Sequence, residues 1–362
     1  MNDPPLRLES LDAFRGLTIA AMILVSTPGT WNAVYGPLEH ADWNGWTPTD
    51  LVFPFLLFAM GAAVPFALGR RRGTPRLRHV LRRAAILFAL GLALTAIETA
   101  PPIDLATFRI PGVLQRIALV YLAIAWLTER TTWRAQMVVA VSALLGYWAA
   151  MTLIPVPSGD TLAGVLDRAI LGRHVLTTWG DPEGLLSTPP SIATALAGVF
   201  AGDWLKQPKQ PHSSIYLWMA GVALTAIGLA WGFVFPINKN LWTSSFAVFG
   251  AGMAAQTLAL CHWLLDVSSW RGWRAWSAPF TAFGRNALVA YFLSVGFDAV
   301  LARWTVDEGA SLKSIVYRAV FARSLSPCCG AEAASLAYAL AYVALWALVV
   351  MEMRRRRIFI GI

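Results

Sequence analysis

The sequence predicts an all-α polytopic membrane protein, a single domain over residues 1–362 folded as a bundle of about ten transmembrane helices. Hydrophobic residues make up 57% of the chain and charged residues only 14%, whereas soluble domains have about 25% charged residues. The mean hydropathy is +0.56. Apolar runs close to the roughly 20 residues that cross a bilayer recur along the whole chain.

Each expected span is an apolar run that polar or Pro/Gly-containing connections separate from the next. Between the last two spans, Arg303–Glu332 is more polar, and we expect Leu312–Ser324 to form an amphipathic helix near the outer surface. An eleventh, weakly hydrophobic span is the alternative for this segment. In chain order, the expected spans are Phe14–Thr30, Thr49–Leu68, Val80–Ile97, Ile110–Leu127, Gln136–Ile154, Ser191–Leu205, Ile215–Phe235, Leu241–Leu265, Phe280–Ala302 and Ala333–Val350.

The basic residues predict how the chain is oriented. The net charge of +9 is not gathered on a polar domain with interleaved aromatic residues, so we expect no nucleic-acid partner. Basic connections face the cytoplasm, which places both termini there and makes the number of spans even. Because the first span lacks a clean cleavage site and no organelle signal is present, we expect a multi-pass protein of the bacterial inner (plasma) membrane. The deciding clusters are Arg70, Arg71, Arg72, Arg76, Arg78, Arg82 and Arg83 after the second span, and Arg354–Arg357 after the last.

Reactive side chains precede the second span, in "LEHADWNGWTPTDLVFPFLLF". His40 and Asp50 then lie at the external mouth of the bundle. A lone loop histidine is more often a surface residue than a catalytic one, and Asp50 in "TPTD" is equally well explained as a helix cap. The three cysteines exclude a disulfide framework and a thiolate zinc site, and we expect no bound metal. The long Pro/Gly-rich outer loop, residues 155–190, is either a lid or a plain connection.

Polar residues inside or next to the spans are further candidates, because a charge inside a bilayer usually faces a cavity, a partner or a substrate path. Asp12 and Arg15 open the first span one turn apart and can pair with each other. The alternative reading of all these residues is a helix cap or an interfacial anchor. The other candidates are Gln115 and Arg116 in "RIPGVLQR", Lys239, Asn240 and Trp242 in "INKNLWTSS", and Arg285 and Asn286 in "FGRNALVAYF".

Together, "LDAFRG", "MILVSTPGTW", "LEHADWNGWTPTD", "RIPGVLQRIALVY" and "INKNLWTSSF" resemble the heparan-alpha-glucosaminide N-acetyltransferase family and its bacterial relatives, in the family's order, over residues 7–302. The resemblance implies a transmembrane acyltransferase that moves acetyl from cytoplasmic acetyl-CoA to the amine of a glucosamine-type sugar or glycan on the external face. It implies that His40 in "HADWNG" is catalytic. The family has an asparagine at the position where this chain has Ser26, so the role that the family implies for the asparagine does not carry over to this chain.

From this resemblance we expect a site in three parts. Neutral imidazole suits removal of a proton from the attacking amine, so His40 is the expected base, or is itself acetylated, and Asp50 orients it or binds the amine. Arginines on the inner side suit the phosphates of CoA, although the positive-inside rule already requires them. The expected substrate-binding residues are Trp43, Asn44, Lys239, Asn240 and Trp242, and the expected acetyl-CoA-binding residues are Arg15, Arg82, Arg83, Gln115, Arg116, Arg285 and Asn286.

Two other classes of function fit parts of the sequence. About ten spans with polar groups and Gly/Pro breaks would also suit an amino-sugar or N-acetylglucosamine transporter, although the halves show no visible repeat. A scaffold protein leaves His40 and Arg116 unexplained. Membrane lipid surrounds the bundle in every case, and a homodimer through lipid-facing helices is a further expectation.

Overall fold

The computed structural model describes residues 8–68, 76–99, 103–207, 212–268, 272–307 and 309–360. Within these ranges the chain is helical apart from connections and one antiparallel pair of short strands, β1 (Thr305–Asp307) and β2 (Ala310–Ser311). Residues 70–72 of the basic cluster after the second expected span lie outside the described residues. The long helices are α1 (Glu9–Ser26), α2 (Val52–Leu68), α3 (Arg76–Thr99), α4 (Val113–Arg130), α5 (Trp133–Leu153), α7 (Thr188–Lys206), α8 (Ser213–Gly232), α9 (Ser244–His262), α12 (Ala287–Arg303) and α15 (Ala331–Arg355).

Shorter elements join these helices. The π-helix η3 directly continues α9, and the expected surface helix at Leu312–Ser324 is observed as a helical run of α13, η4 and α14. This run packs on α15 through Tyr317 and Tyr338, whose ring centroids are 6.2 Å apart. The shorter elements are η1 (Gly36–Leu38), η2 (Pro48–Leu51), α6 (Leu162–Leu171), η3 (Trp263–Val267), α10 (Gly272–Trp276), α11 (Ala278–Arg285), α13 (Leu312–Val316), η4 (Tyr317–Ala322) and α14 (Arg323–Cys329).

Nine of the ten expected spans each coincide with one long helix, whereas Phe280–Ala302 is divided between α11 and α12. The expected count of about ten membrane spans is not confirmed. Among the described residues, six helices are long and apolar enough to cross a membrane, or seven if the bent pair α11 and α12 forms one span. Helix α1 contains Glu9, Asp12 and Arg15, and α4 contains Arg116, Glu129 and Arg130. Helices packed inside a bundle face protein rather than lipid, so they can include such side chains.

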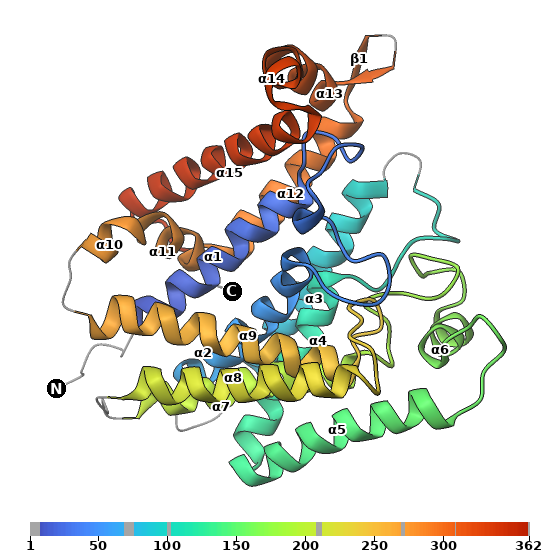
Figure 1. The fold of residues 1–362 in the computed structure, drawn as a ribbon, viewed down its shortest axis with the longest axis vertical. Coiled ribbons are helices and arrows are strands. Elements are labelled where there is room, and N and C mark those ends of the chain that lie inside the picture. The colour runs from blue at the N-terminus through green and yellow to red at the C-terminus, as the bar shows by residue number, and fades with distance from the viewer. Residues whose placement is uncertain are drawn as a thin grey trace.

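The bundle has an inner set of helices and an outer set (Figure 1). In the most apolar stretch of each span, 72% of the residues are buried for the span that contains α2 and 61% for the span that contains α9. The corresponding share is only 17% for α5 and for α8. The outer faces of α5 and α8 are therefore apolar surfaces suited to lipid. The homodimer expected through such faces stays a prediction.

Glycines bring the inner helices into backbone contact. A Cβ placed on Gly16 of α1 would lie 1.7 Å from the carbonyl oxygen of Phe280 in α11, and one on Gly61 of α2 would lie 2.0 Å from the carbonyl oxygen of Ala195 in α7. Small residues at such crossings let membrane helices approach closely. These contacts fix α1 and α2, which line both of the cavities described below.

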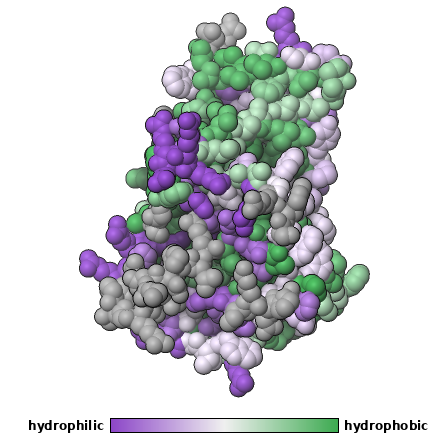
Figure 2. All heavy atoms as spheres, turned by 90° about the vertical axis from the view of Figure 1, so that its left-hand side faces the viewer, coloured by the Kyte–Doolittle hydropathy of each residue, from purple (hydrophilic) through white to green (hydrophobic). Residues whose placement is uncertain are grey.

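The chain folds back on itself after α15. Helices α11 and α12 meet at an angle of 87°, and the buried Asn286 lies at their junction. The Asn286 side chain accepts a hydrogen bond from the backbone N–H of Ile360 at 3.0 Å and donates one to the carbonyl of Ile358 at 3.3 Å. The C-terminal segment is thereby held inside the outline of the bundle (Figure 1). Figure 2 shows the side of the molecule that lies on the left in Figure 1, with a hydrophobic upper part and hydrophilic residues gathered below it.

Candidate active site

Two cavities with charged walls lie at opposite ends of α1 and α2. The first, the histidine cavity, has a volume of about 370 Å³ and touches the C-terminal end of α1 and the N-terminal end of α2. The second, the arginine cavity, has a volume of about 320 Å³ and touches the N-terminal half of α1 and the C-terminal half of α2. A third cavity of about 700 Å³ between α5, α7, α8 and α9 has almost entirely apolar walls and offers no groups for chemistry.

His40 lies on the wall of the histidine cavity and pairs with Asp50. The His40 Nδ1 atom is 2.6 Å from Asp50 Oδ1, and the carboxylate is 1% exposed while the imidazole is 53% exposed. An ionised carboxylate only accepts hydrogen bonds, so Nδ1 donates to Asp50, and in the neutral imidazole Nε2 then keeps its lone pair. The pair therefore presents a base to the cavity.

Asp50 both caps a helix and orients His40. Its Oδ2 accepts hydrogen bonds from the backbone N–H groups of Thr47 at 2.9 Å and Ala41 at 3.2 Å, which leaves Oδ1 for His40. Thr47 and Asp50 form a capping box at the start of η2. The contacts expected of a helix cap and of a residue that orients His40 are thus both present, and binding of the amine by Asp50 stays a prediction.

Lys239 completes the charged group around His40. Its Nζ lies 3.0 Å from His40 Nε2, 3.1 Å from His40 Nδ1 and 3.9 Å from Asp50 Oδ1. Burial lowers the pKa of Lys239 below its usual value, while the carboxylates of Glu183 and Asp50 act in the opposite direction. An ammonium here can stabilise negative charge that develops beside the imidazole.

The loop that contains His40 and the turn that contains Lys239 are tied together. Asn44 accepts a hydrogen bond from the side chain of the buried Asn238 at 3.2 Å, and the backbone N–H of Gly45 donates to the carbonyl of Ile237 at 2.7 Å. These bonds join segments almost 200 residues apart in the chain. Asn44 thus positions Lys239 next to His40.

The remaining expected substrate-binding residues lie outside the lining of the histidine cavity. Trp43 is exposed and packs edge-on against Trp179, with ring centroids 5.2 Å apart, and Asn240 is half-buried. Trp242 is 1% exposed and packs against Phe53. Its backbone φ of 49° is left-handed, a conformation that costs about 1–2 kcal/mol in a non-glycine residue. Burial of the indole offsets this cost, so Trp242 is a core residue and not the sugar contact expected from sequence.

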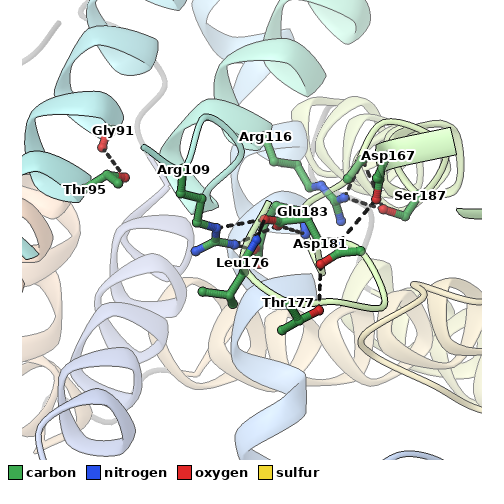
Figure 3. Close-up of polar contacts among 12 residues, drawn as sticks. Gly91, Thr95, Arg109, Arg116, Asp167, Leu176, Thr177, Asp181, Glu183 and Ser187 are labelled. Atoms are coloured by element: carbon green, nitrogen blue, oxygen red, sulfur yellow. Dashed lines mark hydrogen bonds and ion pairs between the residues drawn. The ribbon is translucent and has the colours of Figure 1, made fainter. Parts of the chain in front are cut away.

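The 155–190 loop supplies an acid to the histidine cavity. Arg109 forms a bidentate pair with Asp181 at 2.7 and 2.8 Å and also contacts Glu183 at 2.5 Å (Figure 3). These carboxylates raise the pKa of Arg109 against the opposing effect of burial. Glu183 lines the cavity. The loop is therefore part of the site, and whether it moves as a lid stays a prediction.

Three arginines expected to bind acetyl-CoA line the arginine cavity. Arg15 donates to the carbonyl of Gly284 at 3.2 Å and lies 3.9 Å from Asp12, as its spacing predicted. Arg83 lies over the ring of Tyr121 at 4.8 Å, and Arg285 lies over the ring of Phe359 at 5.5 Å. Ile360 of the C-terminal segment also forms part of the wall.

Four other expected acetyl-CoA ligands do not line this cavity. Arg82 is exposed on α3. Gln115 packs against Gly91 and Gly112, where an added Cβ would lie 2.2 and 2.6 Å from its amide oxygen. Asn286 holds the C-terminal segment. The observed positions of these three residues fit the alternative given above, in which they are helix-cap, packing or surface residues.

Arg116 is the fourth expected acetyl-CoA ligand that does not line the arginine cavity. Its side chain is fully buried and holds a loop in place through hydrogen bonds. It donates to the hydroxyl of Ser187 (Figure 3). It also donates to the carbonyl of Gly184 at 2.8 Å, and its guanidinium lies 5.5 Å from the ring of Trp242. These contacts fix the 155–190 loop against α4. Arg116 therefore holds Glu183 in place through the backbone of Gly184 and does not line the donor passage as expected.

Several residues of the histidine cavity were not predicted from sequence. Glu98 lies in the last turn of α3 and Asp298 lies in the second half of α12, so each is an acid within an apolar run, a signal that singles out functional residues. Tyr291 and Arg303 gave no such signal. Ser26, which stands where the family has asparagine, also lines this cavity. Among the described residues, no group of three or more His, Cys, Asp or Glu side chains is placed to hold a metal ion.

The fold and the site define a class: a multi-pass helical membrane protein with a histidine–carboxylate pair in one cavity and an arginine-lined cavity at the other end of the same helices. The family described as "Heparan-alpha-glucosaminide N-acetyltransferase, catalytic" matches residues 7–229. The chain belongs to this family. The match does not support the transporter alternative.

Two relatives named heparan-alpha-glucosaminide N-acetyltransferase are similar to the chain over most of its length. The human protein is 28% identical over 394 aligned positions, which cover 89% of this chain and 58% of the relative. The mouse protein is 28% identical over 355 positions, covering 79% of this chain and 53% of the relative. The chain thus spans little more than half the length of these curated relatives.

Proposed function

We propose that the protein transfers an acetyl group from acetyl-CoA to the amine of a glucosamine-type sugar. The observation that carries this proposal is the pair of cavities: a buried carboxylate orients a histidine at one end of α1 and α2, and three arginines gather at the other end. The relatives bear the name of this activity.

The arginine cavity suits the donor. Arg15, Arg83 and Arg285 present guanidinium groups that bind phosphate through paired hydrogen bonds, and the rest of the lining is mostly apolar. CoA combines several phosphate charges with a long, weakly polar pantetheine arm. The phosphates would lie at the arginines and the arm would extend along α1 and α2 toward His40.

The histidine cavity suits an amino sugar. Its volume of about 370 Å³ lies within the range of small-molecule sites, roughly 300–1,000 Å³. Glu98, Glu183 and Asp298 add carboxylates to its wall, and a sugar amine reaches the site as an ammonium that such groups attract. Ser26 lines the same cavity and is shorter than the asparagine that the family has at this position. This difference changes the shape of the cavity wall and hence which amino sugar the cavity accepts.

The geometry supports direct transfer with His40 as the base. His40 Nε2 removes the ammonium proton, the free amine attacks the thioester carbonyl, and the Lys239 ammonium stabilises the resulting oxyanion. The C–S bond then breaks while the new C–N bond is kept, and His40 gives its proton to the departing thiolate. The imidazole, neutral again, takes the second proton from the nitrogen of the new amide and releases it to solvent. A route through acetylated His40 uses the same groups, and isolation of acetyl-labelled protein distinguishes it from direct transfer.

We place the arginine cavity on the cytoplasmic side of a bacterial inner membrane and the histidine cavity on the external side. The positive-inside rule supports this placement, because Arg82 and Arg83 lie at the arginine-cavity end of α3 and Arg354–Arg357 lie at the C-terminal end of α15. Acetyl would then cross the membrane while CoA stays inside. A C-terminal tag that is accessible only from outside the cell would contradict this orientation.

The test is an acetyl-transfer assay with purified protein in detergent, labelled acetyl-CoA and glucosamine. His40→Ala and His40→Asn should abolish transfer but keep acetyl-CoA binding, since an exposed loop residue contributes little to helix packing. His212→Ala is the matched control, because His212 is exposed at the start of α8 and lines neither cavity. Substantial transfer by folded His40→Ala would refute the mechanism. Sugar uptake that survives in this variant without acetylation would favour a transporter.

A further inference from the structure

The two cavities share one residue, and on three helices their linings are separated by no more than about one helical turn. Tyr291 of α12 lines both cavities, between Leu288 in the wall of the arginine cavity and Val295 in the wall of the histidine cavity. On α3 the two linings are farther apart, at Leu87 and Glu98. The closely spaced linings, arginine cavity first, are Ile19 and Met22 on α1, Leu56 and Val52 on α2, and Leu114 and Val113 on α4.

The material between the cavities is apolar. Ile19, Met22, Val52, Leu114 and Tyr291 belong to one buried cluster of side chains, and Tyr291 is 7% exposed. A turn of α-helix rises about 5.4 Å. The partition is therefore about as thick as one layer of side chains, and its aliphatic members each face a single cavity, whereas Tyr291 spans it.

The proposed function requires the thioester to cross this layer, because the phosphates and His40 lie on opposite sides of it. We propose that Tyr291 is the specificity-determining residue of this crossing: its side chain sets the width of the passage, admits an acetyl thioester and rejects longer acyl groups. The inference rests on the proposed function and adds to it the size limit on the acyl donor.

Two physical consequences follow from a tyrosine in this place. The ring is rigid and close-packed, so an acyl chain longer by one or two methylenes meets it directly. One methylene in such a pocket changes discrimination by about 10–200-fold. The ring also separates the histidine cavity from the arginine cavity, so its removal should let water reach the thioester and raise hydrolysis relative to transfer.

The experiment compares acetyl-CoA with butyryl-CoA as donors for glucosamine, in purified full-length protein. Tyr291→Ala should raise the butyryl-to-acetyl ratio of kcat/KM for acylation of glucosamine by at least about tenfold. It should also raise the share of CoA that is released without acylation of the sugar. Tyr291→Phe, which keeps the ring, should keep the wild-type ratio. Tyr291→Leu, with an apolar side chain of intermediate volume, should give an intermediate ratio and serves if the alanine variant does not fold.

The matched control is Tyr342→Ala. Tyr342 belongs to the same buried cluster and is 6% exposed, but it lines neither cavity. A general loosening of the bundle would change the ratio in this variant too, and that result would overturn the inference. An unchanged ratio in both Tyr291→Ala and Tyr291→Leu would also overturn it while leaving the proposed function in place. A wild-type protein that transfers no acyl group would instead refute the proposed function.

Discussion

Substitution of Asp50 by asparagine separates its two roles. Asp50 Oδ2 accepts two backbone N–H groups, from Thr47 and Ala41, and Oδ1 accepts from His40. An asparagine has one oxygen and one amide nitrogen. Because the backbone donors require an acceptor, the oxygen takes the Oδ2 place and the amide nitrogen faces His40 Nδ1. The imidazole must then accept at Nδ1 and carry its proton on Nε2, where it no longer acts as a base.

The expected effect is large on the rate and small on stability. General-base catalysis contributes about 10²–10⁴-fold, which corresponds to about 3–5 kcal/mol of transition-state stabilisation at about 1.4 kcal/mol per tenfold change. Asp50→Asn should therefore lower kcat by that factor and keep KM for acetyl-CoA. Since both backbone bonds at Oδ2 are kept, the melting temperature should stay close to that of the wild type.

Asp50→Ala provides the comparison. It removes the acceptor of two backbone N–H groups in half-buried residues together with the capping box, and loss of a helix cap costs about 0.5–2 kcal/mol, so this variant should lose both stability and rate. The assay measures steady-state acetylation of glucosamine together with thermal unfolding in the same detergent. If Asp50→Asn keeps kcat within about tenfold of the wild type, the carboxylate is a helix cap only and the histidine–carboxylate mechanism is wrong.

Two further predictions concern the cations of the site. Arg83→Ala should raise KM for acetyl-CoA with kcat nearly unchanged, because phosphate contacts are equal in the ground and transition states. Arg82→Ala changes an exposed residue outside the cavity and should leave KM unchanged. Equal effects of the two changes, or a collapse of kcat at saturating donor in folded Arg83→Ala, would contradict the assignment of Arg83 to the donor. Burial lowers the pKa of Lys239, so the neutral amine forms at lower pH than in a free lysine and wild-type activity should fall as the pH rises through that lowered pKa. Lys239→Arg, which stays protonated, should abolish this alkaline decline, and a decline of the same shape in the arginine variant would exclude Lys239 as its cause.

The positions of the helices and the His40–Asp50 pair could be predicted from the sequence because both depend on local patterns. Apolar runs mark the helices, and ten residues of one loop bring His40 and Asp50 together. The number of spans could not be predicted in the same way. Helices α1 and α4 have polar side chains that face protein inside the bundle, so hydropathy alone does not decide whether they cross a bilayer.

Arg116 and Trp242 show why the rest of the site could not be predicted. The sequence indicates that a polar or aromatic residue is buried, but not whether protein atoms already satisfy it. The Arg116 guanidinium binds the carbonyl of Gly184, 68 residues away along the chain, and Trp242 packs against Phe53. Glu183 reaches the histidine cavity only because this long loop is clamped, which no local pattern reveals.

The C-terminal segment links the bend between α11 and α12 to the shape of the arginine cavity. Ile360 forms part of the arginine-cavity wall, and Asn286, at the junction of α11 and α12, holds this segment by two hydrogen bonds. A change in the 87° angle between these two helices would therefore carry Ile360 with it. Gly284 and Arg285 at the end of α11 line the same cavity, so one movement of this junction would displace the end of α11 and the C-terminal segment together.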